Sequence, residues 1–331
     1  MRKFFLVLSI AILSLVFATS CNSREIYVFF NTDCIIDLSG RNAKNVKTHI
    51  SSFLNEADNT FSTSIVNSDI YRINSAPAFE IVCVNNSTID LLNLCKEIYE
   101  SDNSFNPAIF PIVELWNFSP DRFTGIEVSS IPEESMITET LLYCSFDNFV
   151  WDSETNSVYK KDTRSKIDLG GIAKGYACDK SFELAEEMQK AIINIGGTIK
   201  TNSEITVHIK NPRPETNQFA AKVAIPDNFA ISTSGDYERY YFYDNLRYHH
   251  IFDPSGQPAW IKSNDPILSV SIIGPSAAIC DALSTLIFIN GLNSKMQIIL
   301  NHYSCSALVL YTEHYEIYGD ISIDFLENRY L

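Results

Sequence analysis

One stretch of thirteen residues, DLGGIAKGYACDK at 168–180, constrains the fold more than any other. Its pattern predicts a short strand that turns at Gly170-Gly171 and enters a helix. The apolar positions expected on one face of this helix are Ala173, Ala177, Leu184 and Met188. Glycines let a ligand approach the backbone, and a helix N-terminus offers free N–H groups to anions. The spacing matches neither GxGxxG nor GxxxxGK[ST], so a plain strand-to-helix turn with a solvated Lys174 stays an alternative to a phosphate cradle.

A second cluster, HHIFDPSG, places two histidines next to an Asp-Pro turn. A histidine in such a place can bind phosphate or move protons. If the stretch is extended, His249 and His250 point to opposite faces, so at most one of them reaches a given site. Histidines packed at the edge of a strand are the alternative explanation.

A third cluster lies in the apolar stretch SAAICDALSTLIFIN at 276–290. Asp281 and Thr285 are four residues apart, which puts carboxylate and hydroxyl on one face of a helix. A lone carboxylate facing a core is costly unless it is paired or binds a metal, and oxygen ligands suit Mg²⁺. An exposed Asp281, with Thr285 bonding back to its own helix, is the alternative.

The remaining chain mixes helical and strand-like patterns. Helical spacing of apolar residues marks 45–62, 88–102 and 276–290, and strand-like patterns mark 26–30, 191–197, 205–212 and 222–233. A polar, proline-containing loop lies at 117–135. We therefore predict an α+β (mixed α/β) fold of enzyme size, built as one composite domain.

The first twenty residues have a basic start, an apolar run and small residues before Cys21. This pattern predicts a secretory signal and not a transmembrane span. The four residues up to Cys21 resemble a bacterial lipobox, although Ala18 replaces the usual Leu, and a plain secretory signal stays an alternative. We expect 1–20 to be a lipoprotein signal peptide and 21–331 an extracytoplasmic domain, lipid-anchored through Cys21 to a bacterial membrane and facing the periplasm.

The net charge of the chain limits the classes of molecule that it can bind. The formal charge is −15, and removing the two cations of the leader makes it −17. Such an acidic protein is not expected to bind nucleic acid, and one that binds a pyrophosphate needs a local cation. The eight cysteines show no zinc-ligand spacing. Cys178 and Cys280 lie in apolar helical stretches and are expected to be small buried thiols.

Taken in order, the three clusters resemble the ApbE family, whose members are FAD:protein FMN transferases. The matching blocks are DLGG-x-x-KGYA-x-D at 168–179, N-x-GG at 194–197, TSGDYERY at 233–240, HxxDPxG at 250–256 and the DALST helix at 281–285. Upstream, 60–74 and 105–118 are similar to two further family segments. The resemblance covers nearly the whole mature chain and implies an ApbE-like fold related to the T-fold.

The chain departs from the family pattern at four places. Asn106 stands where the family usually has Asp, Phe110 replaces Gly, Cys280 replaces Ala, and 30–32 read Phe-Asn-Thr in place of Met-Gly-Thr. Phe30 and Asn106 fall near the flavin pocket that the resemblance implies. A change in FAD affinity or selectivity is therefore one consequence to expect.

The resemblance implies a role for each matched position. Asp168 and Lys174 contact FAD, the Gly171 carbonyl, Asp281 and Thr285 bind Mg²⁺, and His250 lies close to the reacting phosphate. The residues implied to line the flavin or adenine pocket are Phe30, Ser64, Ser104, Phe105, Asn106 and Phe252. Either His250 or Asp281 takes the proton of the attacking hydroxyl.

The implied reaction is Mg²⁺-dependent transfer of FMN from FAD to a Thr or Ser hydroxyl of an acceptor flavoprotein, with release of AMP. The implied acceptors are subunits of membrane redox complexes or FMN-binding domains. Three alternatives stay open. One is an FAD pyrophosphatase, in which water replaces the acceptor hydroxyl, and another is a lipoprotein that binds FAD without catalysis. The third is a structural surface lipoprotein that uses the fold without binding FAD.

Overall fold

A computed structural model describes residues 24–118, 125–214, 217–326 and Tyr330. Its centre is an eight-stranded sheet in the order β1-β2-β7-β8-β11-β14-β15-β16, and every neighbouring pair is antiparallel. The strands are β1 Arg24–Phe29, β2 Thr32–Ser39, β7 Lys190–Ile195, β8 Thr198–Thr201, β11 Ala230–Gly235, β14 Ser269–Gly274, β15 Ser306–Leu310 and β16 Tyr315–Tyr318. The predicted leader and Cys21 lie outside the described residues.

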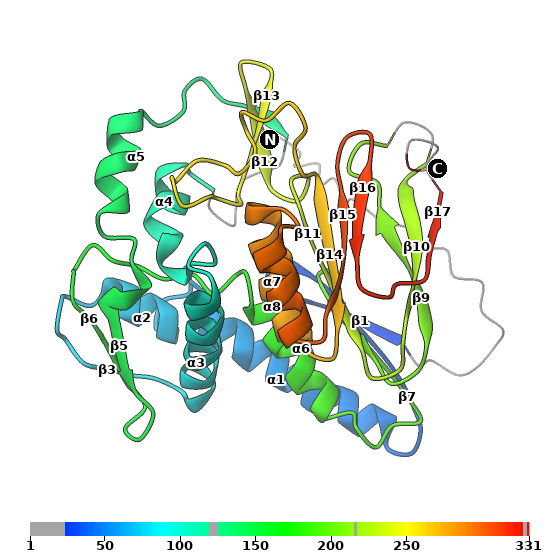
Figure 1. Ribbon diagram of the computed structural model, residues 1–331. Helices are drawn as coiled ribbons and strands as arrows, with labels where there is room; N and C mark the ends of the chain where they lie inside the picture. Colours follow the sequence, from blue (N-terminus) through cyan, green and yellow to red (C-terminus); the bar gives the residue numbers. More distant parts are fainter. Residues whose placement is uncertain (1–23, 119–124, 215–216, 327–329, 331) are drawn as a thin grey trace, which may run out of the picture.

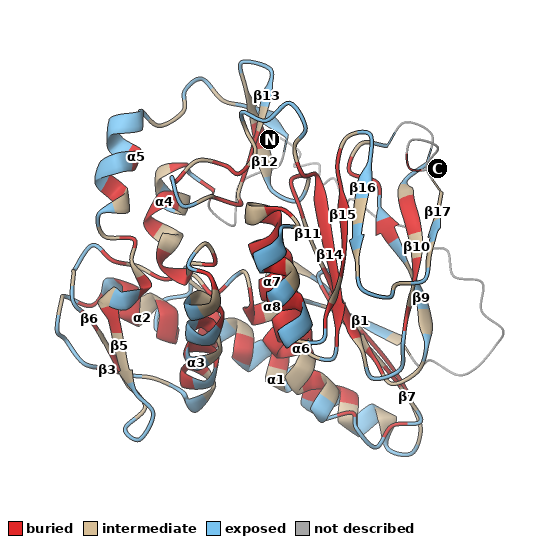
Figure 2. Cartoon of the chain, viewed as in Figure 1, coloured by how far each residue is buried: buried red, intermediate tan, exposed pale blue. Residues whose placement is uncertain are grey.

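Helices cover one face of this sheet (Figure 1). They are α1 Ala43–Phe61, α6 Ala173–Glu183, α7 Ala277–Asn290 and α8 Ser294–His302. Strand β2 shows the alternation that produces two faces: Cys34, Ile36 and Leu38 are at most 1% exposed and belong to the core under the helices. The inner strands β14 and β15 are almost wholly buried (Figure 2).

A small sheet in the order β17-β10-β9 covers part of the other face. Its strands are β9 Ile205–Lys210, β10 Phe219–Ile225 and β17 Ile323–Phe325. They enclose a second apolar core with Ile231, Ile273 and Leu308 of the central sheet. Among the described residues, this core draws no member from β1, β2 or β7, so the apolar core under the small sheet does not extend over that end of the face.

A largely helical part packs beside the sheet. It comprises α2 Asp69–Ser75, α3 Asn86–Ser101, α4 Phe110–Leu115, α5 Glu134–Leu141, the 3₁₀ turns Pro107–Ile109 and Phe146–Asn148, and a small sheet of β3 Val82–Cys83, β5 Phe149–Asp152 and β6 Ser157–Lys160. A last sheet joins β4 Ile126–Glu127, β12 Tyr240–Tyr243 and β13 Leu246–His249. Aromatic side chains tie these parts together: Phe118 stacks on Tyr241 with 4.8 Å between ring centroids.

The structure confirms the α+β prediction and most predicted elements. The thiols of Cys178 and Cys280 are buried, as expected. Over the described part of the chain, no helix combines the length and apolar character that a membrane span requires.

Three local predictions were wrong. Residues before Gly170 form no strand, because the Ile167 N–H bonds to the side chain of Asn74 and the Asp168 N–H to the carbonyl of Pro107. Helix α6 ends at Glu183, so Leu184 is 46% exposed and does not lie on its apolar face.

The third error concerns the run 222–233, which is two strands and not one. A turn at Asn228, with φ of 60°, separates β10 from β11 and sends them into different sheets. Asparagine adopts this left-handed conformation more readily than most residues, and a residue in this conformation interrupts strand pairing.

Helices α6 and α7 cross at Gly175 with almost no space between them. A Cβ added there would lie 2.3 Å from the carbonyl oxygen of Ala277 and 2.7 Å from the Cβ of Asp281. No side chain fits at these distances, so glycine at this position is a packing requirement of the crossing.

Replacing Gly175 with Ala is expected to separate the two helices and to lower the free energy of unfolding by about 2 kcal/mol, a usual cost of overpacking. Urea denaturation measures this change. The control is Lys180→Ala on the exposed side of α6, which should stay within about 0.5 kcal/mol of the parent. A Gly175→Ala protein as stable as the parent would show that the crossing is loose.

Candidate active site

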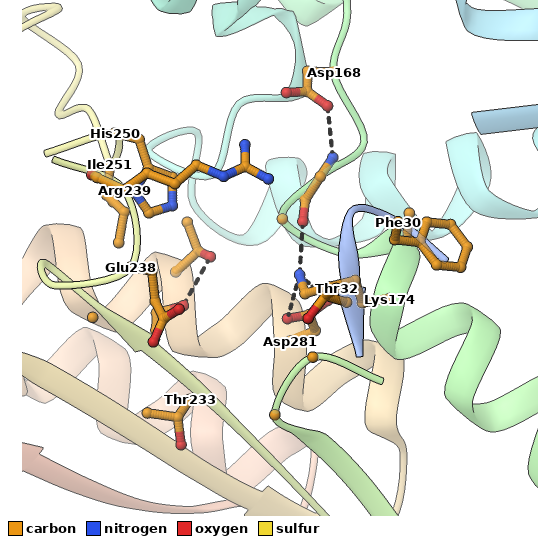
Figure 3. Close-up of a pocket in the computed structure, with 18 of the residues that line it drawn as sticks. Phe30, Thr32, Asp168, Lys174, Thr233, Glu238, Arg239, His250, Ile251 and Asp281 are labelled. Atoms are coloured by element: carbon orange, nitrogen blue, oxygen red, sulfur yellow. Dashed lines mark hydrogen bonds and ion pairs between the residues drawn. The ribbon is translucent and has the colours of Figure 1, made fainter. Parts of the chain in front are cut away.

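One cavity of about 1480 Å³ lies between the helical part and the ends of the sheet strands. It is lined by every described residue to which the sequence assigns a site role, and Figure 3 labels Phe30, Asp168, Lys174, His250 and Asp281 among them. These residues are Phe30, Ser64, Ser104, Phe105, Asn106, Asp168, Gly171, Lys174, His250, Phe252, Asp281 and Thr285. The prediction that they lie together is confirmed, whereas their individual roles stay predictions.

Two tight turns form the rim of the cavity. The turn between β1 and β2 has Phe30 and Asn31 at φ of 54° and 55°, and the turn between β7 and β8 has Gly196 at φ of 57°. A Cβ on Gly196 would lie 2.7 Å from Cγ2 of Thr32, so the two turns pack directly against each other. This contact fixes the position of Phe30 at the cavity.

The carboxylate of Asp281 is 4% exposed and fully partnered. Its Oδ2 accepts the backbone N–H of Gly175 at 3.0 Å and the ammonium of Lys174 at 3.3 Å, while Oδ1 accepts the hydroxyl of Ser232 at 3.0 Å. Ser232 itself lies 2.8 Å from the Thr198 hydroxyl, and both are about 1% exposed. A chain of buried hydroxyls from β8 and β11 therefore holds this carboxylate in one orientation.

The N-terminus of α7 is capped by a carboxylate from α6. Asp179 accepts the N–H groups of Ala277 and Ala278, both at 3.0 Å, and the hydroxyl of Ser276 at 2.7 Å. It also pairs with Lys200 at 2.6 Å. A carboxylate at this end satisfies free N–H groups and favours the helix dipole, so it fixes the helix that carries Asp281 and Thr285.

Lys174 bridges the glycine turn and α7. Its ammonium donates to the Gly170 carbonyl at 3.0 Å and faces Asp281 (Figure 3). The Asp168 carboxylate accepts the Gly170 N–H at 2.8 Å, which shapes the turn. Lys174 is thus bonded at the base of the turn and not freely solvated, and the use of the turn as a phosphate cradle stays a prediction.

The oxygen donors around Asp281 fit a hard divalent cation. Thr285 lies one helical turn further along α7, and a Cβ on Gly171 would lie 3.6 Å from its hydroxyl. No group of three or more His, Cys, Asp or Glu side chains placed to hold a metal is found within the described ranges. A magnesium site needs few carboxylates when substrate phosphates and waters complete its shell. The ammonium of Lys174 against Asp281 shows that this position suits positive charge.

Only one of the two adjacent histidines lines the cavity, as predicted. His249 is 4% exposed and bonds through Nε2 to the Ala259 carbonyl at 2.9 Å. The Nδ1 of His250 lies 3.2 Å from the Arg239 carbonyl, which can only accept a hydrogen bond. Nδ1 of His250 therefore carries the proton, and Nε2 holds a free lone pair.

Burial lowers the pKa of His250 well below the usual value of 6.5, and the positive charge of Arg239 lowers it further. Burial also lowers the pKa of His249. His250 is consequently neutral at pH 7 and can accept a proton.

Comparisons with known proteins agree with this geometry. The model of the ApbE family matches residues 30–309. The chain belongs to the ApbE family. It is 32% identical over 225 residues to the FAD:protein FMN transferase of Klebsiella pneumoniae, covering 67% of this chain and 68% of that protein. The Treponema pallidum protein of the same name is 28% identical over 283 residues, covering 78% and 75%.

Solved ApbE structures share the fold. The ApbE protein of Thermotoga maritima superposes with a TM-score of 0.76 at 27% identity, over 90% of this chain and 96% of that one. The flavin transferase ApbE of Vibrio cholerae gives a TM-score of 0.74 at 21% identity, over 89% and 96%. The ApbE-like fold is thus shown.

The departure from the ApbE pattern at Asn106 has a local explanation. Its Oδ1 accepts the Ala108 N–H at 2.9 Å, and its Nδ2 donates to the Cys144 carbonyl at 2.7 Å. An ionised Asp could accept the first bond but could not donate the second. Asn106 thus fits its surroundings, and its side chain is held by the protein.

The other predicted pocket residues differ in how much of each side chain is free to contact a ligand. Phe252 is 5% exposed and packs against Trp116 and Phe118, so it belongs mainly to an aromatic core. The hydroxyls of Ser104 and Ser64 are bonded to Asn290 and Ser62 at 3.3 and 3.2 Å.

Sequence reasoning missed several residues of the ApbE site. Asp179 holds α7 and ends the DLGG-x-x-KGYA-x-D block, to which other roles were assigned, whereas Ser232, which orients Asp281, lies just before the TSGDYERY block and in no motif. Arg239 and Glu238 line the cavity, and Arg239 lies with His250 on one side of it (Figure 3). The YERY letters of the matched motif were the available signal for this pair.

The pH dependence of stability follows from the lowered pKa of His250. Below about pH 6.5 the unfolded chain binds protons that the folded chain does not, so stability is lost as pH falls. Between pH 7.5 and 5.5 the parent should therefore lose about 1 kcal/mol more free energy of unfolding than His250→Gln. Urea titrations at both pH values measure the difference.

The matched control is His302→Gln, which changes an exposed histidine on α8 and should retain the parental pH profile. An unchanged pH dependence in His250→Gln would mean that His250 titrates as freely in the folded protein as in the unfolded chain.

Proposed function

We propose that this protein transfers the FMN moiety of FAD to a serine or threonine hydroxyl of an acceptor protein, forming a phosphoester and releasing AMP. The observation that carries the proposal is one cavity in which a fixed carboxylate, a cation and a neutral histidine converge: Asp281, Lys174 and His250. The relatives at 32% and 28% identity bear the name FAD:protein FMN transferase.

We propose further that the reaction depends on Mg²⁺. Asp281, Thr285 and the main chain at Gly171 would hold the ion. When bound, Mg²⁺ supplies charge neutralisation for the pyrophosphate and for the departing AMP.

The protein's own groups account for the remaining steps. The Gly170-Gly171 turn admits the diphosphate close to the backbone, and Lys174 adds a positive charge at its base. Nε2 of His250 takes the proton of the attacking hydroxyl. The hydroxyl oxygen then bonds to the FMN-side phosphorus, and the bond from that phosphorus to the AMP oxygen breaks, its electron pair leaving with AMP.

Between His250 and Asp281, the geometry favours His250 as the base. Asp281 accepts hydrogen bonds from Gly175 and Ser232, and its remaining lone pairs would be taken by the proposed Mg²⁺ ion. His250 has one ring nitrogen free, and its lowered pKa keeps that nitrogen unprotonated at pH 7 and able to accept a proton.

We also propose that the mature protein is lipid-anchored through Cys21 on the periplasmic side of a bacterial membrane, where its acceptor is a flavoprotein subunit of a membrane redox complex or an FMN-binding domain. The support is the leader sequence and the lipobox-like residues before Cys21.

Transfer can be tested by incubating the mature protein with FAD, Mg²⁺ and candidate acceptor polypeptides, with and without EDTA. Mass spectrometry should show acceptors heavier by FMN, and EDTA should abolish the product. Asp281→Asn should lower the rate by at least about 100-fold, and the exposed control Asp265→Asn should not change it. Release of FMN and AMP without any labelled acceptor would favour a pyrophosphatase, and FAD binding without turnover a carrier.

A second test addresses the orientation of Asp281. Ser232→Ala removes one of its hydrogen bonds and should weaken Mn²⁺ binding about 10- to 100-fold, the usual effect of losing a group that orients a metal ligand. Titration calorimetry with Mn²⁺ measures this directly. Ser181→Ala removes an equally buried hydroxyl that makes no hydrogen bond in the described structure, and should bind Mn²⁺ as the parent does. If Ser232→Ala and Ser181→Ala bind Mn²⁺ with equal affinity, Ser232 does not orient the metal ligand Asp281.

A further inference from the structure

The cavity is larger than one substrate requires. Pockets for drug-sized ligands and cofactors usually measure about 300–1,000 Å³. The cavity here measures about 1480 Å³ and extends from Asp281 on the helix side of the sheet to β9 on the other side. Space is therefore left beside a dinucleotide for part of a second molecule.

Strand β9 presents a free edge to this space. In the small sheet β9 pairs only with β10, and no described strand lies on its other side. All six residues of β9 line the cavity, although alternate side chains of a strand point to opposite faces. The cavity must therefore run along the backbone edge of β9, where N–H and C=O groups lack a strand partner.

A partly apolar face of the central sheet lies beside the same space. Ile26 and Val28 of β1 are 61% and 70% exposed. Ile26 pairs with Ile35, and residues paired across strands share a face, so both lie on the face that the small sheet covers only in part. Ile35 and Ile192 line the cavity together with the charged residues Arg24, Asp37 and Lys190. Ile26 and Val28 do not line it but lie beside this lining on β1. We call the free edge of β9 together with Ile26, Val28 and Ile35 the edge groove.

We propose that the edge groove binds the acceptor protein as an extended segment that pairs with β9 as an added strand. The inference rests on the proposed function, because it supplies the site for the second substrate. It is argued from two features: the groove is continuous with the cavity that holds Asp281 and His250, and an unpaired strand edge recognises a polypeptide backbone.

This docking mode defines the chemistry of the acceptor. Six residues of β9 span about 20 Å, so the segment pairs over about six residues. Main-chain hydrogen bonds would provide affinity, and every second side chain would face Ile26 and Ile35, which favours apolar or β-branched residues there. The accepting Ser or Thr would lie at the end of the paired segment, where the groove reaches His250.

The first step of the test finds a peptide substrate. A pool of 13-residue synthetic peptides with a central threonine and randomised flanks is incubated with the mature protein, FAD and Mg²⁺, and fluorescent flavin-labelled peptides are sequenced. If the parent labels no peptide and no folded candidate acceptor, the proposed function fails. If it labels only folded acceptors, an extended segment is not sufficient for docking, and the edge-groove inference is overturned.

The second step methylates the backbone nitrogens of the best peptide one at a time. An added strand directs alternate N–H groups toward β9, so methylation should lower transfer at least 10-fold at every second position on one side of the threonine and have little effect between. Tolerance at all positions, or losses without this alternation, would overturn the inference while leaving the proposed function intact.

The third step changes the groove. Ile26→Asp should raise KM for the peptide at least 10-fold and leave FAD binding unchanged, as followed by flavin fluorescence. Ile298→Asp on α8 is the control, because Ile298 is 71% exposed and lies away from the groove, so its KM should stay parental. An unchanged KM in Ile26→Asp would contradict the inference. Dimerisation of the mature protein, with an effect of Ile26→Asp that disappears when the enzyme is diluted to monomers, would assign the groove to a second copy of this chain and overturn the inference as well.

Discussion

The contact between Gly175 and Asp281, where α6 and α7 cross, supports the rest of the site. The glycine lets the helices approach until its own N–H reaches the carboxylate at 3.0 Å, and any side chain would prevent this. The same approach places the side chain of Lys174 against Asp281 and brings the glycine turn beside Thr285. Asp179, also on α6, caps α7 and holds the crossing from its other end. Packing and chemistry therefore depend on one close approach.

The sheet contributes as much to the site as the helices do. The Ser232 hydroxyl of β11 bonds to Asp281 and is itself bonded to the Thr198 hydroxyl of β8, so the carboxylate is oriented by the sheet as well as by α6. The rim turns place Phe30 at the mouth of the cavity. Because the apolar core under the small sheet does not extend over β1, β2 and β7, the cavity continues past the rim along that end of the face. The same architecture thus provides an enclosed place for a dinucleotide and an open one for a polypeptide.

A feature could be predicted from sequence when the residues that determine it lie close together along the chain. Asp281 and Thr285 were predictable, because four residues along a helix fix their relation and apolar neighbours fix their face. The separation of His249 from His250 followed from strand geometry in the same way. The motifs also brought Asp168, Lys174 and His250 together through the family resemblance, although local reasoning alone left each with a plain structural alternative.

What could not be predicted depends on partners distant in sequence. The segment before Gly170 is extended without being a strand, because Asn74 and Pro107 take its N–H groups. Helix α6 ends at Glu183 even though apolar residues continue the helical spacing beyond it. The pairing that leaves β9 at an edge depends on β17, which comes from the end of the described chain to take the other side of β10. Ser232 gave no signal of its own, since only the fold puts its hydroxyl beside Asp281.

The central claim is that the carboxylate held at the helix crossing marks the place where a divalent cation and the diphosphate of FAD meet. The most direct measurement is a crystal structure of the mature protein with FAD and Mn²⁺, recorded at the manganese absorption edge. The account predicts one anomalous peak in contact with Asp281 and Thr285, with the diphosphate against the Gly170-Gly171 turn. An anomalous peak elsewhere, or a diphosphate bound away from that turn, would contradict it.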